Sequence, residues 1–172
     1  MKWVLLVVAV AAVIVGGVAV IGLTLPQDHI VSRTARLSAP PDSVWSIITN
    51  VADFPIWRKD VKSVEQVRGT TLFTWRENMS HGKLTFEATT LDAPRHLVAH
   101  IVGENQGFGG SWDYLIEPDG TGSKITITEN GKVFNPVFRF ISHYLIGQAA
   151  TLDNYLSALS ARTGDKYSPG AA

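Results

Sequence analysis

The chain has 172 residues, of which 45% are hydrophobic and 17% are charged, a composition that fits one ordinary domain plus an additional apolar segment. Its 15 basic and 15 acidic residues cancel, so no net field favours a nucleic-acid backbone, and we expect no nucleic-acid partner. The sequence contains no cysteine, which excludes disulfides, thiolate metal sites and cysteine nucleophiles.

The N-terminal segment is apolar throughout. Residues 3–25 contain no charged side chain, and this length is enough for a helix to cross the roughly 30 Å hydrocarbon layer. A cleaved signal sequence is the alternative, but its apolar core is normally only about 7–15 residues long. We therefore predict a transmembrane anchor over residues 1–26 and a short linker over 27–30. The short basic N-terminus favours a single-pass membrane protein whose soluble domain is extracytoplasmic.

The soluble domain is expected to span residues 31–164 and to begin with a strand over 31–37. A short helix should follow at Pro41, because proline is favoured in the first turn of a helix. A second short helix is expected to start after Asn50 and to end around Pro55.

From residue 61 onward apolar and polar residues alternate, and turn residues separate the alternating segments. This pattern predicts an antiparallel meander. The expected strands cover residues 61–67, 71–79, 83–91, 96–102, 111–116 and 124–128. In each strand the more apolar set of side chains should face the core. These inward positions are Phe73, Trp75, Leu84, Phe86, Leu97, Ala99, Ile101, Trp112, Tyr114, Ile125 and Ile127.

A long amphipathic helix over residues 136–162 is expected to close the domain. Asn135 can cap its first amides, and Gly164 follows its last turn. At helical spacing one apolar stripe contains Val137, Ile141, Tyr144, Leu145, Gln148, Leu152, Tyr155, Leu156 and Leu159. The remaining tail, 165–172, is expected to be disordered. Together these elements predict an α+β domain in which the helix lies on the sheet.

Several of these segments resemble one known superfamily. They are the runs APPDSVW (39–45), FPIW (54–57) and GSWDY (110–114), the strand at 121–128 and the closing helix. In order and composition they are similar to the START-like helix-grip superfamily, also called SRPBCC or polyketide cyclase/dehydrase and lipid transport. The resemblance implies a curved antiparallel sheet wrapped on a long C-terminal helix, with a deep cavity between them for a hydrophobic molecule. Members include carriers, cyclases and sensors, so the fold does not select one activity.

The candidate ligand-binding residues are those expected to line this cavity. Trp57, Trp75, Trp112 and Tyr144 offer large apolar surfaces with polar tips, although each of them can instead be an ordinary core residue. Glu77 follows Trp75 in the alternation and should share its inward face, where a carboxylate needs hydrogen bonds or a raised pKa. The alternative is that the strand twists at its end and leaves Glu77 in water.

Three functions remain open at this stage. The first is a membrane-anchored binding domain for a hydrophobic small molecule, which is a lipid, a polyketide or a quinone-like compound. The second is a cyclase or dehydratase in which Glu77, Asp113 or His100 acts as a general acid or base inside the cavity, and His100 is therefore also a candidate ligand-binding residue. The third is a structural or interaction domain with a filled core.

We expect no cofactor and no metal. His96 and His100 are four residues apart on a predicted strand, which separates them by about 13 Å, too far to share one ion. In the absence of a nucleophile, metal or phosphate motif, we favour binding over catalysis.

Overall fold

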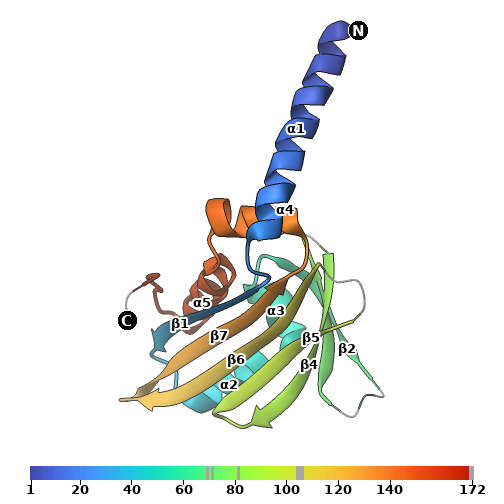
Figure 1. Ribbon diagram of the computed structural model, residues 1–172. Coiled ribbons are helices and arrows are strands. Elements are labelled where there is room, and N and C mark those ends of the chain that lie inside the picture. The colour runs from blue at the N-terminus through green and yellow to red at the C-terminus, as the bar shows by residue number, and fades with distance from the viewer. Residues whose placement is uncertain (69, 71, 81, 104–106, 171–172) are drawn as a thin grey trace.

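Within the residues that the structure describes, seven strands form one curved antiparallel sheet around the C-terminal helix (Figure 1). The computed structural model describes residues 1–68, 70, 72–80, 82–103 and 107–170. The strand order is β1-β7-β6-β5-β4-β3-β2. The strands are β1 (Asp28–Leu37), β2 (Val61–Val67), β3 (Thr74–Met79), β4 (Gly82–Asp92), β5 (His96–Val102), β6 (Phe108–Asp119) and β7 (Gly122–Val133). This architecture confirms the predicted α+β helix-grip fold.

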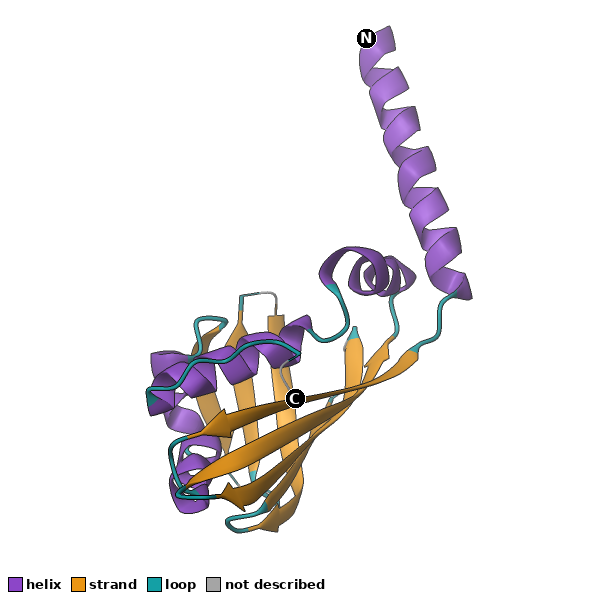
Figure 2. Cartoon of the chain, turned by 90° about the vertical axis from the view of Figure 1, so that its left-hand side faces the viewer, coloured by secondary structure: helices purple, strands orange, loops and turns teal. Residues whose placement is uncertain are grey.

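Most helices lie on the concave side or at one end of the sheet, whereas the N-terminal helix projects away from the domain (Figure 2). In chain order the helical elements of the described residues are α1 (Lys2–Thr24), α2 (Pro41–Thr49), the 3-10 turn η1 (Val51–Asp53), α3 (Phe54–Trp57), α4 (Pro136–Ile141), the π-helical turn η2 (Ser142–Ile146) and α5 (Ala150–Thr163). By length and composition α1 is able to cross a membrane, and a signal sequence at an N-terminus has the same properties.

The core lies between the concave face of the sheet and helices α2 and α5. The strand register sets Trp75 opposite Phe86 and Leu97 opposite Tyr114, so the predicted inward alternation is confirmed. Each buried leucine or isoleucine contributes roughly 1.5–3 kcal/mol to stability. The most deeply buried aliphatic side chains are Val44, Ile48, Ile116, Ile125, Ile127, Leu152, Leu156 and Leu159.

Several strands are longer than predicted. The first begins at Asp28 instead of residue 31, because Asp28 pairs with Lys132 and most of the expected linker becomes strand. The last two strands, β6 and β7, continue pairing through glycines near the start of β6 and the end of β7. A Cβ at Gly110 would overlap the carbonyl oxygen of Asn130, so this close approach requires glycine. Thr71, predicted within the third strand, lies outside the described residues.

The prediction of one continuous helix over residues 136–162 is wrong. Helix α4 passes into η2 and stops at Gly147, whose φ of 87° is rarely adopted by residues with a side chain. The chain then turns and starts α5, which runs along the concave side of the sheet (Figure 2). The predicted apolar stripe therefore reaches the core only through the residues of α5, and Tyr144 and Leu145 are exposed.

The start of the C-terminal tail is held by the domain, which differs from the predicted disorder over residues 165–172. Asp165 accepts hydrogen bonds from the backbone N–H of Ser38 at 2.9 Å and from the hydroxyl of Thr163 at 2.7 Å. The Tyr167 hydroxyl donates to Asp153 at 2.7 Å, and burial, together with this carboxylate, raises the pKa of Tyr167 to about 12. Tyr167 also packs against the core.

Candidate functional site

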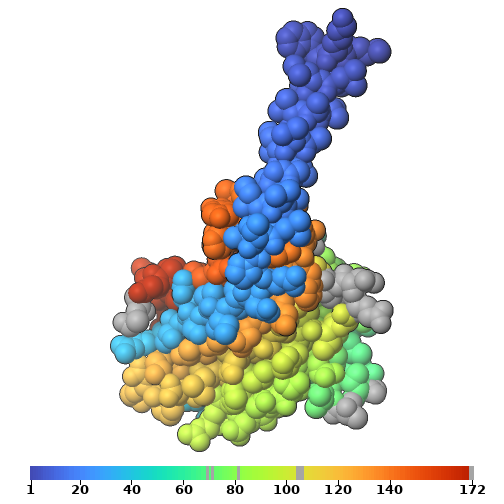
Figure 3. Space-filling model, in the orientation of Figure 1, coloured from blue at the N-terminus to red at the C-terminus, as the bar shows by residue number. Residues whose placement is uncertain are grey.

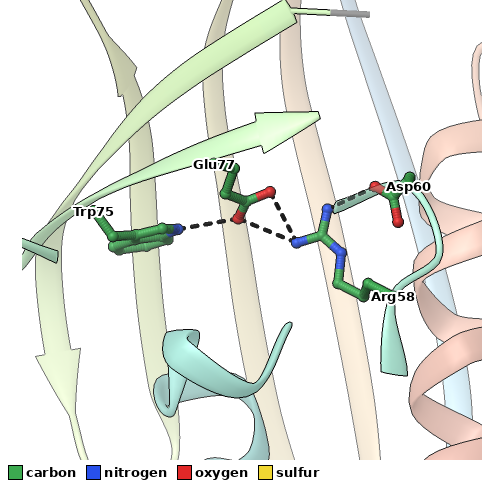
Figure 4. A network of polar contacts seen from close by, with 4 residues as sticks. All are labelled: Arg58, Asp60, Trp75 and Glu77. Carbon is green, nitrogen blue, oxygen red and sulfur yellow. Dashed lines mark hydrogen bonds and ion pairs between the residues drawn. The ribbon is translucent and has the colours of Figure 1, made fainter. Parts of the chain in front are cut away.

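A buried ion pair lies on the concave side of the sheet (Figure 4). The Arg58 guanidinium donates from Nη1 to Oε1 of Glu77 at 3.1 Å. The indole N–H of Trp75 donates to the same oxygen at 3.0 Å. From its other terminal nitrogen Arg58 donates to Asp60 at 2.8 Å. The side chains of Arg58 and Glu77 are only 8% and 2% exposed, whereas that of Asp60 is 52% exposed. The network therefore connects the interior to the surface.

Local structure explains why these residues meet. Trp75 and Glu77 are two residues apart on β3, so both side chains point to the concave face. Helix α3 ends at Trp57, and the next residue, Arg58, closes its last turn with a hydrogen bond from its backbone N–H to the carbonyl of Phe54 at 2.8 Å. The next strand, β2, pairs with β3 and sets Val64 opposite Glu77. The predicted inward orientation of Glu77 is thus realised, and hydrogen bonds to its carboxylate accompany its burial.

The electrostatics of the pair favour a charged arginine. Burial by itself lowers the pKa of Arg58, but the negative charges of Glu77 and Asp60 outweigh it and raise the pKa above its ordinary value. The guanidinium carbon also lies 5.1 Å from the ring centre of Phe54 and 5.2 Å from that of Tyr155. Oε2 of Glu77 lies 3.0 Å from Arg58 but without hydrogen-bond alignment, so one carboxylate oxygen has no aligned donor in the described chain.

Tyr155 of α5 is the centre of an aromatic cluster beside the ion pair. Its ring makes edge contacts with Trp57 and Trp112, with ring centres 5.4 Å away in both cases, and with Tyr114 at 5.8 Å. Burial raises the pKa of Tyr155 and of Tyr114, so both hydroxyls stay protonated at neutral pH. The indole N–H of Trp57 is buried and has no hydrogen-bond partner among the described residues.

The concave face differs in exposure along its length. Near α2, Leu97, Ile116 and Ile125 are buried. Towards α4 four inward side chains are only half-buried, although β4, β5 and β6 are interior strands of the sheet and the inward Trp75, Glu77 and Ala99 beside them are fully buried. Because these four side chains point to the concave side, solvent reaches them from that side alone. The half-buried positions are Leu84, Phe86, Ile101 and Trp112. The concave face is therefore fully buried near α2 and partly exposed at these four positions, which we call its accessible end.

A second polar pair lies at the accessible end. His29 of β1 is 3.3 Å from Oε1 of Glu129 on β7, and both side chains are mostly buried. The register pairs Glu129 with Trp112, so the carboxylate is on the concave face. Its other oxygen is buried without a hydrogen-bond partner in the part of the chain that the structure describes. This oxygen can accept a hydrogen bond from a bound molecule.

Four of the six predicted site residues gather in this interior. Trp57, Trp75, Glu77 and Trp112 surround Tyr155 or belong to the buried ion-pair network, which does not by itself test their predicted role in binding. Sequence reasoning missed two central residues, Arg58 and Tyr155. The burial of Glu77 was itself a signal, because a buried carboxylate needs a cation and Arg58 follows the apolar run FPIW.

The other two predicted residues lie elsewhere. His100 alternates with the inward Ala99 and Ile101, so it faces the outer side of the sheet and not the interior as predicted. Tyr144 is 56% exposed on η2 and packs against Phe140 and His143. The break at Gly147 is the reason, because it separates η2 from the helix that covers the sheet.

A curved antiparallel sheet, closed over a C-terminal helix around an aromatic interior, defines a START-like helix-grip domain. The chain belongs to the polyketide cyclase / dehydrase and lipid transport family, whose family model matches residues 28–161. No curated protein sequence matches the chain.

Solved structures have the same fold at low sequence identity. A START superfamily protein from Mycobacterium smegmatis matches with a TM-score of 0.64 and 16% identity, covering 79% of this chain and 97% of that one. The Zhui aromatase/cyclase from a Streptomyces species matches with a TM-score of 0.65 and 13% identity, covering 80% and 94%. A Thalictrum norcoclaurine synthase point mutant, in complex with a transition state analogue, matches with a TM-score of 0.61 and 12% identity, covering 79% and 94%. At these identities the likeness concerns the fold alone.

Proposed function

We propose that this chain is a membrane-anchored binding domain for one hydrophobic small molecule, held between the sheet and α5. Helix α1 is the anchor, and the domain lies on the extracytoplasmic side. The single observation that carries the proposal is the exposure of the concave face. Apolar side chains of the interior strands remain half-buried near α4, whereas those near α2 are fully buried. Apolar surface in such a position favours an apolar ligand.

Polar groups beside this surface define the kind of ligand. Among the described residues the indole N–H of Trp57 and one carboxylate oxygen of Glu129 have no partner, so the first can donate a hydrogen bond to a ligand and the second can accept one. Unpaired buried groups of this kind are costly, and a ligand that pairs with them recovers that cost. A molecule with an apolar body and a hydroxyl group matches these groups, because a hydroxyl both donates and accepts. Lipids, polyketides and quinone-like compounds include such molecules.

The Arg58–Glu77 pair has a supporting role in this proposal. Its charges are already satisfied by each other, by Trp75 and by Asp60. The pair therefore fixes the indole of Trp75, which stacks on Phe86 at a ring-centre distance of 5.4 Å and contacts the tilted ring of Phe73 at 5.2 Å. A rigid aromatic wall binds an apolar ligand with less loss of side-chain entropy.

No observation favours the enzyme alternative to the same degree. Of the three acid–base candidates, only Glu77 faces the interior, and it is ion-paired. Asp113 lies between the inward Trp112 and Tyr114, so it faces outward, where it pairs with His96 at 3.0 Å. His100 faces the same outer side. General acid–base catalysis needs titratable groups that converge on the bound substrate.

Filling the accessible end of the concave face tests the proposal. Ile101→Trp adds a large ring at a half-buried inward position of β5. The matched control, Leu115→Trp, adds the same ring at an exposed outward position of β6. We expect organic extracts of the purified full chain to contain an apolar compound in stoichiometric amounts. Mass spectrometry should find its loss in Ile101→Trp and its retention in Leu115→Trp.

The comparison between the two variants removes the background of bulk lipid, because both chains carry the same anchor. An extract of Ile101→Trp that matches the wild-type extract, from a variant with wild-type circular dichroism, would refute binding between the sheet and α5.

A further inference from the structure

Beside the base of α1 the domain exposes an unusual number of large apolar side chains. They come from the start of β6, the end of β7, α4 and η2, and two of them, Phe108 and Phe138, stack at a ring-centre distance of 5.6 Å. Leu145 and Ile146, at the end of η2, are 72% and 64% exposed. We call the following set the apolar platform: Phe108, Phe134, Phe138, Tyr144, Leu145 and Ile146. Neighbouring large apolar side chains that remain exposed are typical of a binding surface.

The structure fixes α4 against the last turn of α1. Gly22 is buried there, and a Cβ at this position would overlap the carbonyl oxygen of Pro136. The buried side chain of Arg139 donates from Nη1 to the carbonyl of Leu25 at 2.8 Å. These contacts join α4 to the end of the N-terminal helix. In the space-filling view α4 and η2 lie directly beside the base of α1, above the sheet (Figure 3).

The length of α1 sets the depth of this contact in a bilayer. About 20 helical residues cross a hydrocarbon layer of roughly 30 Å. If this span of residues starts at Trp3, the far edge of the hydrocarbon layer lies close to Gly22, which is the residue of α1 that contacts α4. A helix fixed at that level lies at the boundary between acyl chains and headgroups, where aromatic and aliphatic side chains are stabilised.

We propose that the apolar platform is inserted into the membrane interface, so that the lipid bilayer is its partner. This inference rests on the membrane anchor in the proposed function. It also assigns a purpose to the break at Gly147, which frees α4 and η2 from the sheet and leaves α5 to cover it. The accessible end of the concave face is the end nearest α4, so it faces the bilayer. A hydrophobic ligand then passes between membrane and interior without crossing water.

The absence of cysteine from the sequence makes a site-specific test straightforward. Leu145→Cys, Ser157→Cys and Val13→Cys each allow one environment-sensitive fluorophore to be attached to the full chain in phosphatidylcholine vesicles. Ser157 is exposed on α5, away from the platform, and Val13 is in the middle of α1. Quenching by a spin-labelled phospholipid is compared with quenching by aqueous iodide. For Leu145→Cys we expect a ratio of lipid to iodide quenching several-fold higher than for Ser157→Cys.

The Val13→Cys chain separates the failure of this inference from the failure of the anchor. Strong lipid quenching at Val13 with equal, iodide-dominated quenching at Leu145 and Ser157 would overturn the interfacial platform and leave the anchor intact. Iodide-dominated quenching at Val13 as well would overturn both.

Discussion

Replacing Arg58 by methionine is expected to lower the free energy of unfolding by about 3–5 kcal/mol. The substitution leaves the carboxylate of Glu77 buried without its cation, and an uncompensated buried charge is strongly destabilising. The loss of stability comes from the unpaired carboxylate of Glu77. Adding Glu77→Leu to the Arg58→Met chain should therefore recover most of the lost free energy of unfolding. Urea unfolding of the full chain in mild detergent, followed by tryptophan fluorescence, measures the wild type, Arg58→Met, Glu77→Leu and the double variant.

The neighbouring residue on β3 provides a matched control for this cycle. Arg76 pairs with Glu65 at 3.5 Å, but the two side chains are 44% and 72% exposed. Arg76→Met should therefore cost only about 0–1 kcal/mol. Equal losses of stability for Arg58→Met and Arg76→Met would mean that the buried pair is not a coupled unit. The same conclusion would follow if the double variant of Arg58→Met and Glu77→Leu lost the sum of what its two single variants lose.

The second large effect is expected at Leu156, which is fully buried on α5. Leu156→Ala should lower the free energy of unfolding by about 2–5 kcal/mol, because it leaves a cavity between the helix and the sheet. Leu145→Ala removes the same atoms from an exposed position on η2 and should change stability by no more than about 0.5 kcal/mol. Both are measured by the same urea unfolding in detergent.

The contrast tests the corrected C-terminal structure. In one continuous helix both leucines would face the sheet and both substitutions would be costly. A large loss of stability for Leu145→Ala would therefore contradict the break at Gly147.

Alternation predicted the sheet well because its period of two is strict. The inward positions from Phe86 to Ile127 follow from the apolar residues alone, and the register agrees with them. The same rule already placed His100 and Asp113 outside, since each lies between two inward residues. The prediction that His100 and Asp113 act inside the cavity is therefore wrong, and alternation alone indicates the outer face for both.

The break in the C-terminal helix was harder to predict. The apolar stripe continues in phase across Gly147, so helical periodicity on its own gives no sign of a turn. The break accompanies tertiary contacts between segments that are far apart in sequence. Gly22 contacts Pro136, and Arg139 of α4 donates to the carbonyl of Leu25. Arg58 was missed for a related reason: its contact with Glu77 joins a short helix to a distant strand.

Native mass spectrometry of the full chain, released from detergent micelles, tests most directly whether the interior holds a hydrophobic molecule. We predict that the wild-type chain carries one apolar small molecule per polypeptide and that Ile101→Trp has the mass of the polypeptide alone. A wild-type chain that shows only the polypeptide mass, when it is isolated with its native membrane lipids still present, would contradict the proposed function.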